Sequence, residues 1–172
     1  HTGSDNFVRP SMGAWITYGL GGENQNLPAF ITICPTLAHG GVNNWGAAFL
    51  PAKCQGTPIG NASIPSDQAI VRHVRNSRLT PDQQRKQLDL LGELNRDHAA
   101  ERGGDPTLEA RIQTMETAFR MQTAASDAFD LNRESARVRE MYGRGHFGNA
   151  CLLARRLAER GVRVTQIYYG NG

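Results

Sequence analysis

The sequence predicts a layered α/β fold with a mostly parallel sheet, and its last segment is the main reason. From 149 to 161 apolar residues recur at helical spacing, and Gly161 suits the left-handed turn that ends a helix. Residues 162–169 then form a run rich in β-branched and aromatic side chains, which is typical of a strand. A short helix followed by a strand is also expected within 11–34. Helix and strand in repeated succession indicate parallel strands joined by helical crossovers.

The first helix is expected to begin near Pro10 or Ser11 and to end at Gly19 or Gly21, because proline and serine favour helix starts and glycine favours helix ends. A strand follows over 27–34, where β-branched and aromatic residues gather. This unit gives the proposed sheet its first strand.

The last helix is expected to start at Asn149, whose side chain can accept a bond from an early backbone N–H. The strand after it is expected to be central in the sheet, with Tyr168 and Tyr169 at its end. Ligands of parallel α/β sheets bind beyond the carboxyl ends of the strands. The sequence therefore predicts a ligand site next to these tyrosines.

Residues 36–79 are expected to form a long loop. Glycine, proline and asparagine recur there, and regular periodicity disappears. Trp45, Phe49 and Leu50 are the large apolar residues in its middle. A loop of this length in a compact domain is usually functional or an insertion over a site.

Residues 80–145 are expected to form a helical insertion. Thr80 to Gln83 is a capping box with proline at the first helical position, which predicts a helix to about Arg102. A second helix begins after Asp105, and a weaker third one covers 133–142. The expected core-facing stripe of the first of these helices is Leu88, Leu91, Leu94 and His98.

The chain is thus interpreted as one partial domain, 1–172. It divides into an α/β segment (1–35), a long loop (36–79), a helical insertion (80–145) and a helix–strand unit (146–172). The first residue is not methionine and the last follows directly on a strand, so we expect an internal piece of a longer protein.

Composition excludes two classes of partner. The chain is 39% apolar and 20% charged, and no apolar run approaches membrane-spanning length. The net charge is only +3, and the one basic stretch, 72–78, lacks the aromatic residues of a nucleic-acid interface. We expect no membrane span and no nucleic-acid partner.

Metal-binding signals are weak in the residues themselves. The histidines have neither HxH nor HExxH spacing, and the cysteines form no CxxC pair. His98 is interpreted as a hydrogen-bonded core histidine. Cys34 and Cys54 would be able to pair in an exported protein, a point that the sequence leaves open.

Several segments together resemble a known family. They are 9–21 (RPSMGAWITYGLG), 23–30 (ENQNLPAF), 46–51 (GAAFLP), 85–95 (RKQLDLLGELN), 118–122 (AFRMQ) and 151–161 (CLLARRLAERG). The chain is similar to a large bacterial family that is classed as a domain of unknown function and is related to sulfatases and alkaline phosphatases. The segments come in the order of the family and cover nearly the whole chain.

The resemblance implies an α/β sandwich of the alkaline phosphatase type, a twin-arginine export signal, and a periplasmic or extracellular location. It also implies hydrolysis of sulfate or phosphate esters with bound divalent metal, such as zinc, calcium or manganese. The metal ligands of the family pattern lie outside the matching segments. No catalytic residue or metal ligand is therefore assigned to this chain, and none of its residues is expected to hold a metal alone.

The candidate substrate-binding residues come from the first segment and from the end of the last strand. They are His1, Thr2, Arg9, Ser11, Tyr169 and Asn171. Arg9 and Ser11 are expected to hold an anionic ester group, and Asn171 to donate a hydrogen bond to it. Each also has a purely structural interpretation, for example Ser11 as a helix N-cap.

Two functions follow as hypotheses. In the first, the intact protein is a metal-dependent hydrolase acting on a small-molecule or polysaccharide ester. In the second, it is a non-catalytic envelope protein that binds a polysaccharide or a partner through residues 36–66 and the helical insertion.

Overall fold

A three-stranded parallel sheet organises the computed structural model, which describes residues 7–37, 40–61, 78–102 and 106–169. The strands are β1 (Phe30–Ile33), β2 (Thr57–Ile59) and β3 (Val164–Ile167), in the order β2-β1-β3. Both neighbours run parallel to β1, with Ile31 opposite Thr57 on one side and Thr165 on the other. The fold class predicted from the sequence, α/β with a parallel sheet, is confirmed.

The structure corrects two expectations about this sheet. β3 is predicted to be central, but the central strand is β1, and β3 lies half-buried at one margin of the described sheet. β2 lies inside 36–79, where the sequence predicts only loop. Two short 3₁₀ helices, η1 (Gly41–Asn44) and η2 (Ala52–Cys54), also occur in that segment.

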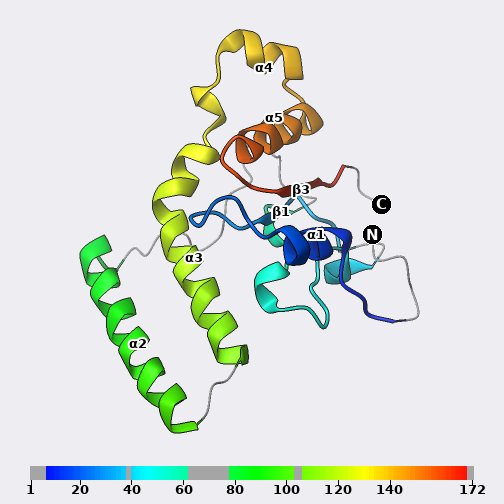
Figure 1. Cartoon of the computed structure of the whole chain (residues 1–172). Helices are drawn as coiled ribbons and strands as arrows, with labels where there is room; N and C mark the ends of the chain where they lie inside the picture. Colours follow the sequence, from blue (N-terminus) through cyan, green and yellow to red (C-terminus); the bar gives the residue numbers. More distant parts are fainter. Residues whose placement is uncertain (1–6, 38–39, 62–77, 103–105, 170–172) are drawn as a thin grey trace.

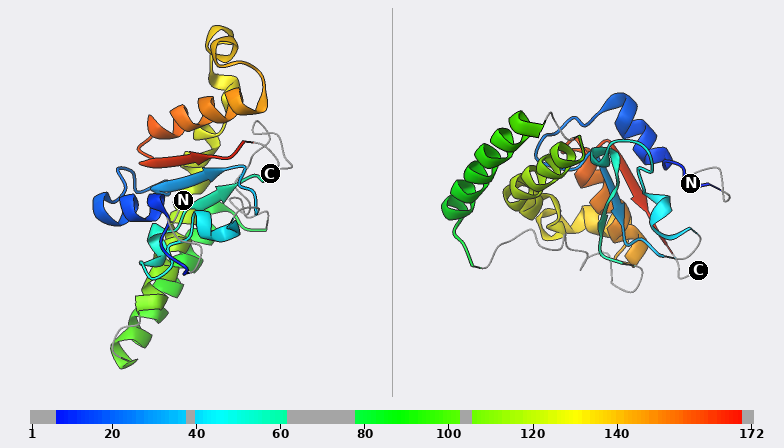
Figure 2. Two further views of the ribbon diagram at one scale, coloured as in Figure 1. Left: turned by 90° about the vertical axis from the view of Figure 1, so that its right-hand side faces the viewer. Right: turned by 90° about the horizontal axis from the view of Figure 1, so that it is seen from below.

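Helices cover both faces of β1 (Figures 1 and 2). Ile31 and Ile33 point to one face, where they join the main core with leucines of α5 (His146–Ala158). Phe30 and Thr32 point to the other face, since side chains alternate along a strand. There α1 (Met12–Leu20) crosses, and Gly13 lies directly against the Phe30 ring. The layers are therefore helix, sheet and helix.

The boundaries of α1 agree with the sequence prediction. The Ser11 hydroxyl accepts a hydrogen bond from the Ala14 N–H at 3.3 Å, which caps the first turn. The helix ends at Gly21, which has a φ of +67°. Only glycine adopts that region without a steric penalty, so the turn towards β1 needs this residue.

The start of α5 differs from the prediction. The helix begins at His146 with Gly145 as its N-cap, one turn before the expected cap at Asn149. Asn149 lies inside the first turn, and its side-chain amide donates to the Arg144 carbonyl at 3.4 Å. Gly148 explains the earlier start, because a side chain there would collide with the Tyr142 carbonyl oxygen and only glycine lets the helix pass.

The helical insertion consists of α2 (Pro81–Arg102), α3 (Pro106–Ala128), the 3₁₀ turn η4 (Leu131–Arg133) and α4 (Ala136–Tyr142). The predicted capping box is present. The Thr80 N–H donates to Gln83 Oε1 at 3.0 Å, and the Gln83 N–H donates to Thr80 Oγ1 at 3.3 Å. The two long helices project away from the sheet (Figure 1).

The apolar stripe predicted for α2 does not face a core. Leu91 is 49% exposed, Leu94 is 56% exposed, and His98 is exposed rather than a core histidine. Two contacts join α2 to α3: a 3.0 Å bond from Gln122 to Gln84, and Arg85 over the Phe119 ring. Amphipathic spacing predicted the helix correctly, but of its predicted stripe only Leu88 is partly buried among the described residues.

A buried arginine fastens α5 to the end of α3. Arg156 is only 3% exposed, and its Nε and Nη2 donate to the carbonyls of Ala128 and Asp127 at 3.1 and 2.7 Å. Its Nη1 lies 2.5 Å from a Glu134 carboxylate oxygen. Arg160, one turn later, pairs with the Asp127 carboxylate at 2.6 Å. These bonds position the insertion relative to the sheet.

Candidate functional site

The carboxyl ends of the three strands meet at one edge of the sheet. Cys34 follows β1, Gly60 and Asn61 follow β2, and Tyr168 follows β3. The alignment is fixed by backbone bonds, since the Cys34 N–H donates to the Ile59 carbonyl at 2.8 Å and the Tyr168 N–H to the Ile33 carbonyl at 3.1 Å. Parallel α/β sheets bind ligands at this edge, which makes it the candidate site.

Backbone conformation at this edge is unusual. Cys34 has a φ of +49°, in the left-handed region that non-glycine residues avoid, and Gly60 has a φ of +65°. A left-handed non-glycine residue costs on the order of 1–3 kcal/mol, and such residues cluster at functional sites. The bond from the Cys34 N–H to Ile59 and the bond from the Tyr168 N–H to the preceding Ile33 carbonyl hold this turn in place.

Aromatic and polar side chains cover the face of the sheet next to this edge. The Tyr168 ring meets the Trp45 ring edge to face, with centroids 6.1 Å apart. The Gln166 amide donates to the Tyr168 hydroxyl at 2.6 Å. Burial raises the pKa of the Tyr168 phenol above its ordinary value, because the charged form is disfavoured away from water. Trp45 and Gln166 therefore both contact the Tyr168 side chain.

Three of the six predicted site residues lie in the described part of the chain. Arg9 is exposed. Tyr169 is 75% exposed, and its ring meets Phe147 at the start of α5 with a centroid distance of 5.2 Å. His1, Thr2 and Asn171 lie outside the described residues.

Ser11 has the N-cap role that the sequence also allowed. Its side chain is 0% exposed, and the hydroxyl accepts from the Ala14 N–H as the N-cap of α1. Contact with a substrate would require it to leave that bond and the core. The structure therefore supports the N-cap role of Ser11 rather than contact with a substrate.

The first segment and the end of β3 are connected through one short stretch of loop. The Ser11 N–H donates to the Gly46 carbonyl at 3.0 Å, and the neighbouring Trp45 packs against Tyr168. Ser11 and Tyr168 therefore contact the same loop. Whether Arg9 and Tyr169 bind substrate stays a prediction.

Sequence reasoning missed Asn61 and Trp45 as neighbours of this edge. Asn61 reaches it because β2 pairs with β1, and β2 is only three residues long with Pro58 in its middle. Proline is rare inside strands, and it is tolerated here because β2 lies at a margin of the described sheet. The one sequence feature that favoured a strand here was the β-branched Ile59, which is fully buried in the structure.

The described residues do not form a metal centre. Among them no group of three or more histidine, cysteine, aspartate or glutamate side chains is placed to hold an ion. Cys34 and Cys54 are buried as thiols rather than joined in a disulfide. The donor set of this part of the chain thus does not fit a metal by itself.

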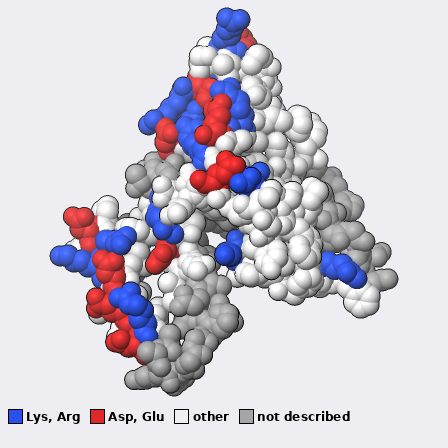
Figure 3. Space-filling view, in the orientation of Figure 1, with Lys and Arg blue, Asp and Glu red and all other residues white. Residues whose placement is uncertain are grey.

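Charged side chains are distributed unevenly over the surface. Figure 3 shows mixed positive and negative groups over α2 and around α5, while the side of the molecule that carries α1 and the sheet is largely uncharged. No helix within the described ranges has both the length and the apolar character needed to cross a bilayer.

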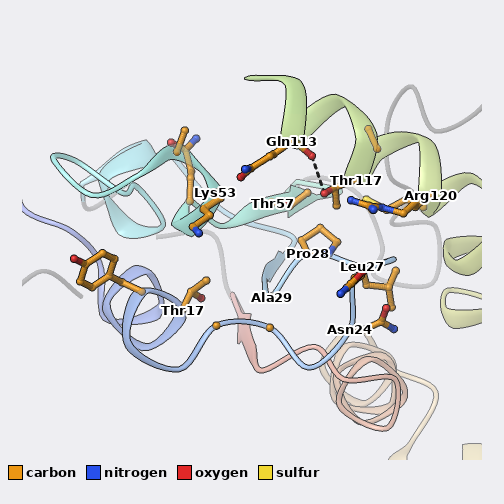
Figure 4. Close-up of a pocket in the computed structure, with 18 residues that line it drawn as sticks. Thr17, Asn24, Leu27, Pro28, Ala29, Lys53, Thr57, Gln113, Thr117 and Arg120 are labelled. Carbon is orange, nitrogen blue, oxygen red and sulfur yellow. Dashed lines mark hydrogen bonds between the residues drawn. The ribbon is translucent and has the colours of Figure 1, made fainter. Parts of the chain in front are cut away.

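A cavity of about 760 Å³ opens at the other end of the sheet. Ala29 and Thr57, at the amino ends of β1 and β2, form its base, and α1, η2 and α3 form its walls (Figure 4). The sequence analysis did not anticipate it, because its residues come from segments far apart in the chain.

The chain is an α/β protein with a parallel sheet and a helical insertion. The family described as "Protein of unknown function (DUF1501)" matches residues 1–171, and the chain belongs to that family. No match was found among the curated proteins or among the solved structures.

Proposed function

We propose that this chain is part of an exported, metal-dependent hydrolase of sulfate or phosphate esters. The observation that carries the proposal is the convergence of three parallel carboxyl ends, with Cys34, Asn61 and Tyr168 at one edge. The sequence resemblance to sulfatases and alkaline phosphatases adds the reaction class. Those enzymes build their sites at this position of an α/β sheet.

In this proposal the metal supplies the electrophile that stabilises the attacking and leaving oxygens. The described residues do not contain its ligands, so no step through the metal is assigned to them. Their own contribution is to shape the edge of the site. The Tyr168 ring, packed against Trp45, forms part of this edge, and the exposed Arg9 offers positive charge to the anionic ester.

The test uses the intact protein. Its metal content is measured, and hydrolysis of aryl sulfate and aryl phosphate esters is followed with and without a chelator. We expect bound divalent metal and chelator-sensitive turnover of one ester class. Absence of both metal and turnover, in folded protein, contradicts the enzyme hypothesis.

A variant pair localises the site. Arg9→Ala is expected to lower kcat/KM by about tenfold or more, since a charge-assisted bond to the ester is lost. Arg144→Ala, which removes another exposed arginine before α5, serves as the matched control. Equal kcat/KM in both variants removes Arg9 from the proposed site.

The alternative, a non-catalytic envelope protein, is favoured by one observation. The exposed leucines of α2 present an apolar surface on a helix that has few contacts with the described fold. The same experiments separate the two proposals, because a binding protein shows neither metal-dependent turnover nor an effect of Arg9→Ala on any ester.

A periplasmic or extracellular location is part of both proposals and rests on the resemblance. Cell fractionation with a cytoplasmic marker tests it. Recovery of the intact protein with the cytoplasmic marker contradicts it.

A further inference from the structure

The cavity at the amino ends of the strands has the size of a ligand site and is separate from the candidate edge. Its volume of about 760 Å³ falls within the range of small-molecule pockets. Leu27, Ala29 and Met121 give it an apolar base, two of them buried in the main core. The base is therefore supported by the packed part of the fold.

The charge of this cavity is positive. Lys53 on η2 and Arg120 on α3 both line it, whereas none of its described lining residues is aspartate or glutamate. Figure 4 shows Lys53 and Gln113 reaching from facing walls into the space between η2, α3 and α1. Cationic side chains without lining carboxylates favour an anionic ligand.

Arg120 is only partly neutralised. Its Nη2 lies 3.8 Å from a Glu116 carboxylate oxygen on the exposed side of α3. Its Nε is buried and has no hydrogen-bond partner. A guanidinium presents several N–H donors in a fixed plane, so a bound oxyanion would be able to accept hydrogen bonds from those that have no partner.

Thr17 is an independent indication of a missing partner. Its side chain is 6% exposed, it lines the cavity from α1, and its hydroxyl is buried without a hydrogen bond. Buried hydroxyls are nearly always bonded, because leaving one unsatisfied costs about 1–3 kcal/mol. A ligand hydroxyl or oxyanion in the cavity would satisfy it.

The remaining polar residues around the cavity are uncharged. They are amides and hydroxyls that both donate and accept, the chemistry that recognises sugar hydroxyls: Gln25, Gln55, Thr57, Gln113 and Thr117. The Thr117 hydroxyl donates to the backbone carbonyl of Gln113 at 2.8 Å, whereas the Gln113 side chain extends into the cavity (Figure 4).

We propose that this cavity binds an anionic sugar unit, a hydroxyl-rich ligand that carries a sulfate or carboxylate group. The positive charge of Lys53 and Arg120 attracts the anion, and Thr17 with the lining amides binds hydroxyls. The proposal does not depend on ester hydrolysis, because the cavity lies at the opposite end of the sheet from the candidate edge.

Calorimetric titration of the intact protein with three probes tests this: galactose 4-sulfate, glucuronic acid and unsubstituted galactose. We expect one of the two anionic sugars to bind, with neutral galactose at least about tenfold weaker. Tighter binding of galactose 4-sulfate or of glucuronic acid shows whether the anionic group of the ligand is a sulfate or a carboxylate. Equal binding of neutral galactose, or no binding of any probe, overturns the proposal.

Two substitutions link binding to the cavity. Lys53→Gln is expected to weaken binding of the anionic probe by about tenfold or more. Lys86→Gln, at an exposed position of α2, is expected to leave the affinity unchanged. Equal affinity of both variants places binding elsewhere and overturns the proposal.

Thr17→Val separates a ligand role from a structural one. Removing a buried hydroxyl without a partner is expected to leave the melting temperature of the ligand-free protein unchanged or higher. Affinity for the anionic probe is expected to fall several-fold in the same variant. Unchanged affinity in a variant that folds normally overturns the role of Thr17 as a ligand contact. The readout is binding, so failure here is distinguishable from absence of esterase activity.

Discussion

Arg156 is a charged residue buried in the core, and its effect on stability depends on the groups that it bonds there. The side chain bonds the Ala128 and Asp127 carbonyls and the Glu134 carboxylate. Replacement by alanine leaves these acceptors unpaired in a buried place. We expect Arg156→Ala to lower the free energy of unfolding by about 3–5 kcal/mol, measured by urea denaturation.

The matched control is the neighbouring Arg155. It makes salt bridges with Glu159 at 2.8 Å and Glu134 at 3.6 Å, but its side chain is far more exposed. Arg155→Ala is expected to lower the free energy of unfolding by less than about 1 kcal/mol. Similar losses in the two variants would mean that burial does not set the importance of Arg156.

Two glycines of α1 have opposite surroundings. A Cβ at Gly13 would collide with the Phe30 ring, whereas a Cβ at Gly19 would meet nothing within 4 Å. Gly13→Ala is expected to destabilise by about 1–3 kcal/mol through overpacking. Gly19→Ala is expected to be neutral or to stabilise by up to about 1 kcal/mol, because alanine favours the helix. Thermal denaturation of both variants checks the sign, and a stabilising Gly13→Ala contradicts the close contact.

Asp127 makes stability dependent on acid pH. A hydrogen bond and the charge of Arg160, with smaller contributions from Arg133 and Arg156, lower the pKa of its carboxyl below the ordinary value of 3.8. The unfolded chain therefore binds a proton more readily than the folded one. The stabilisation is fully present above about pH 4 and is lost as the pH falls through the folded pKa.

Asp127→Asn tests this dependence. We expect the variant to be less stable at neutral pH and to lose less stability than the parent between about pH 4 and pH 2. Melting temperature against pH is the measurement. An unchanged slope in the variant would show that other carboxyls, such as Glu159 beside Arg155, carry the acid dependence.

At the scale of elements, α2 is the helix that is least attached. The Gln84–Gln122 bond and the Arg85–Phe119 contact lie near its start, and its leucines are exposed. Backbone amides of α2 are expected to exchange with deuterium at least roughly tenfold faster than those of α5, which covers the sheet. Hydrogen-exchange mass spectrometry measures both helices together. Equal protection would show that α2 is covered in solution.

Elements with strong local signals were predictable from the sequence. The capping box at Thr80 and the glycine at 21 mark helix ends because those bonds form within four residues. β2 was missed because three residues with a central proline give no periodicity. Its existence depends on pairing with β1, more than 20 positions earlier.

The candidate site was predictable in position but less so in composition. The end of β3 follows from helix–strand succession, and Tyr168 does lie at a parallel carboxyl edge. Ser11 was ambiguous in the sequence because an N-cap and an anion contact share one pattern, and the structure shows the N-cap. The amino-end cavity was not predictable, since Thr17, Lys53 and Arg120 meet only through tertiary packing.

Across the whole molecule, stability is concentrated in the sheet and α5. Leu157 is fully buried in the main core, whereas Leu91 is half exposed on α2, which projects from the sheet. Leu157→Ala is expected to destabilise by about 2–5 kcal/mol, and Leu91→Ala by no more than about 0.5 kcal/mol. Chemical denaturation of both variants provides the comparison. A large effect of Leu91→Ala would mean that α2 belongs to the cooperative unit.

The position of β3 at a margin of the described sheet determines where a further strand could pair. Within the part of the chain that the structure describes, β3 pairs only with β1, so its other side presents a row of backbone donors and acceptors in the spacing that another strand requires. Any segment that aligned there would extend the layer without disturbing β1 or β2. It would also enclose Val164 to Ile167 and turn the present border of the sheet into its interior.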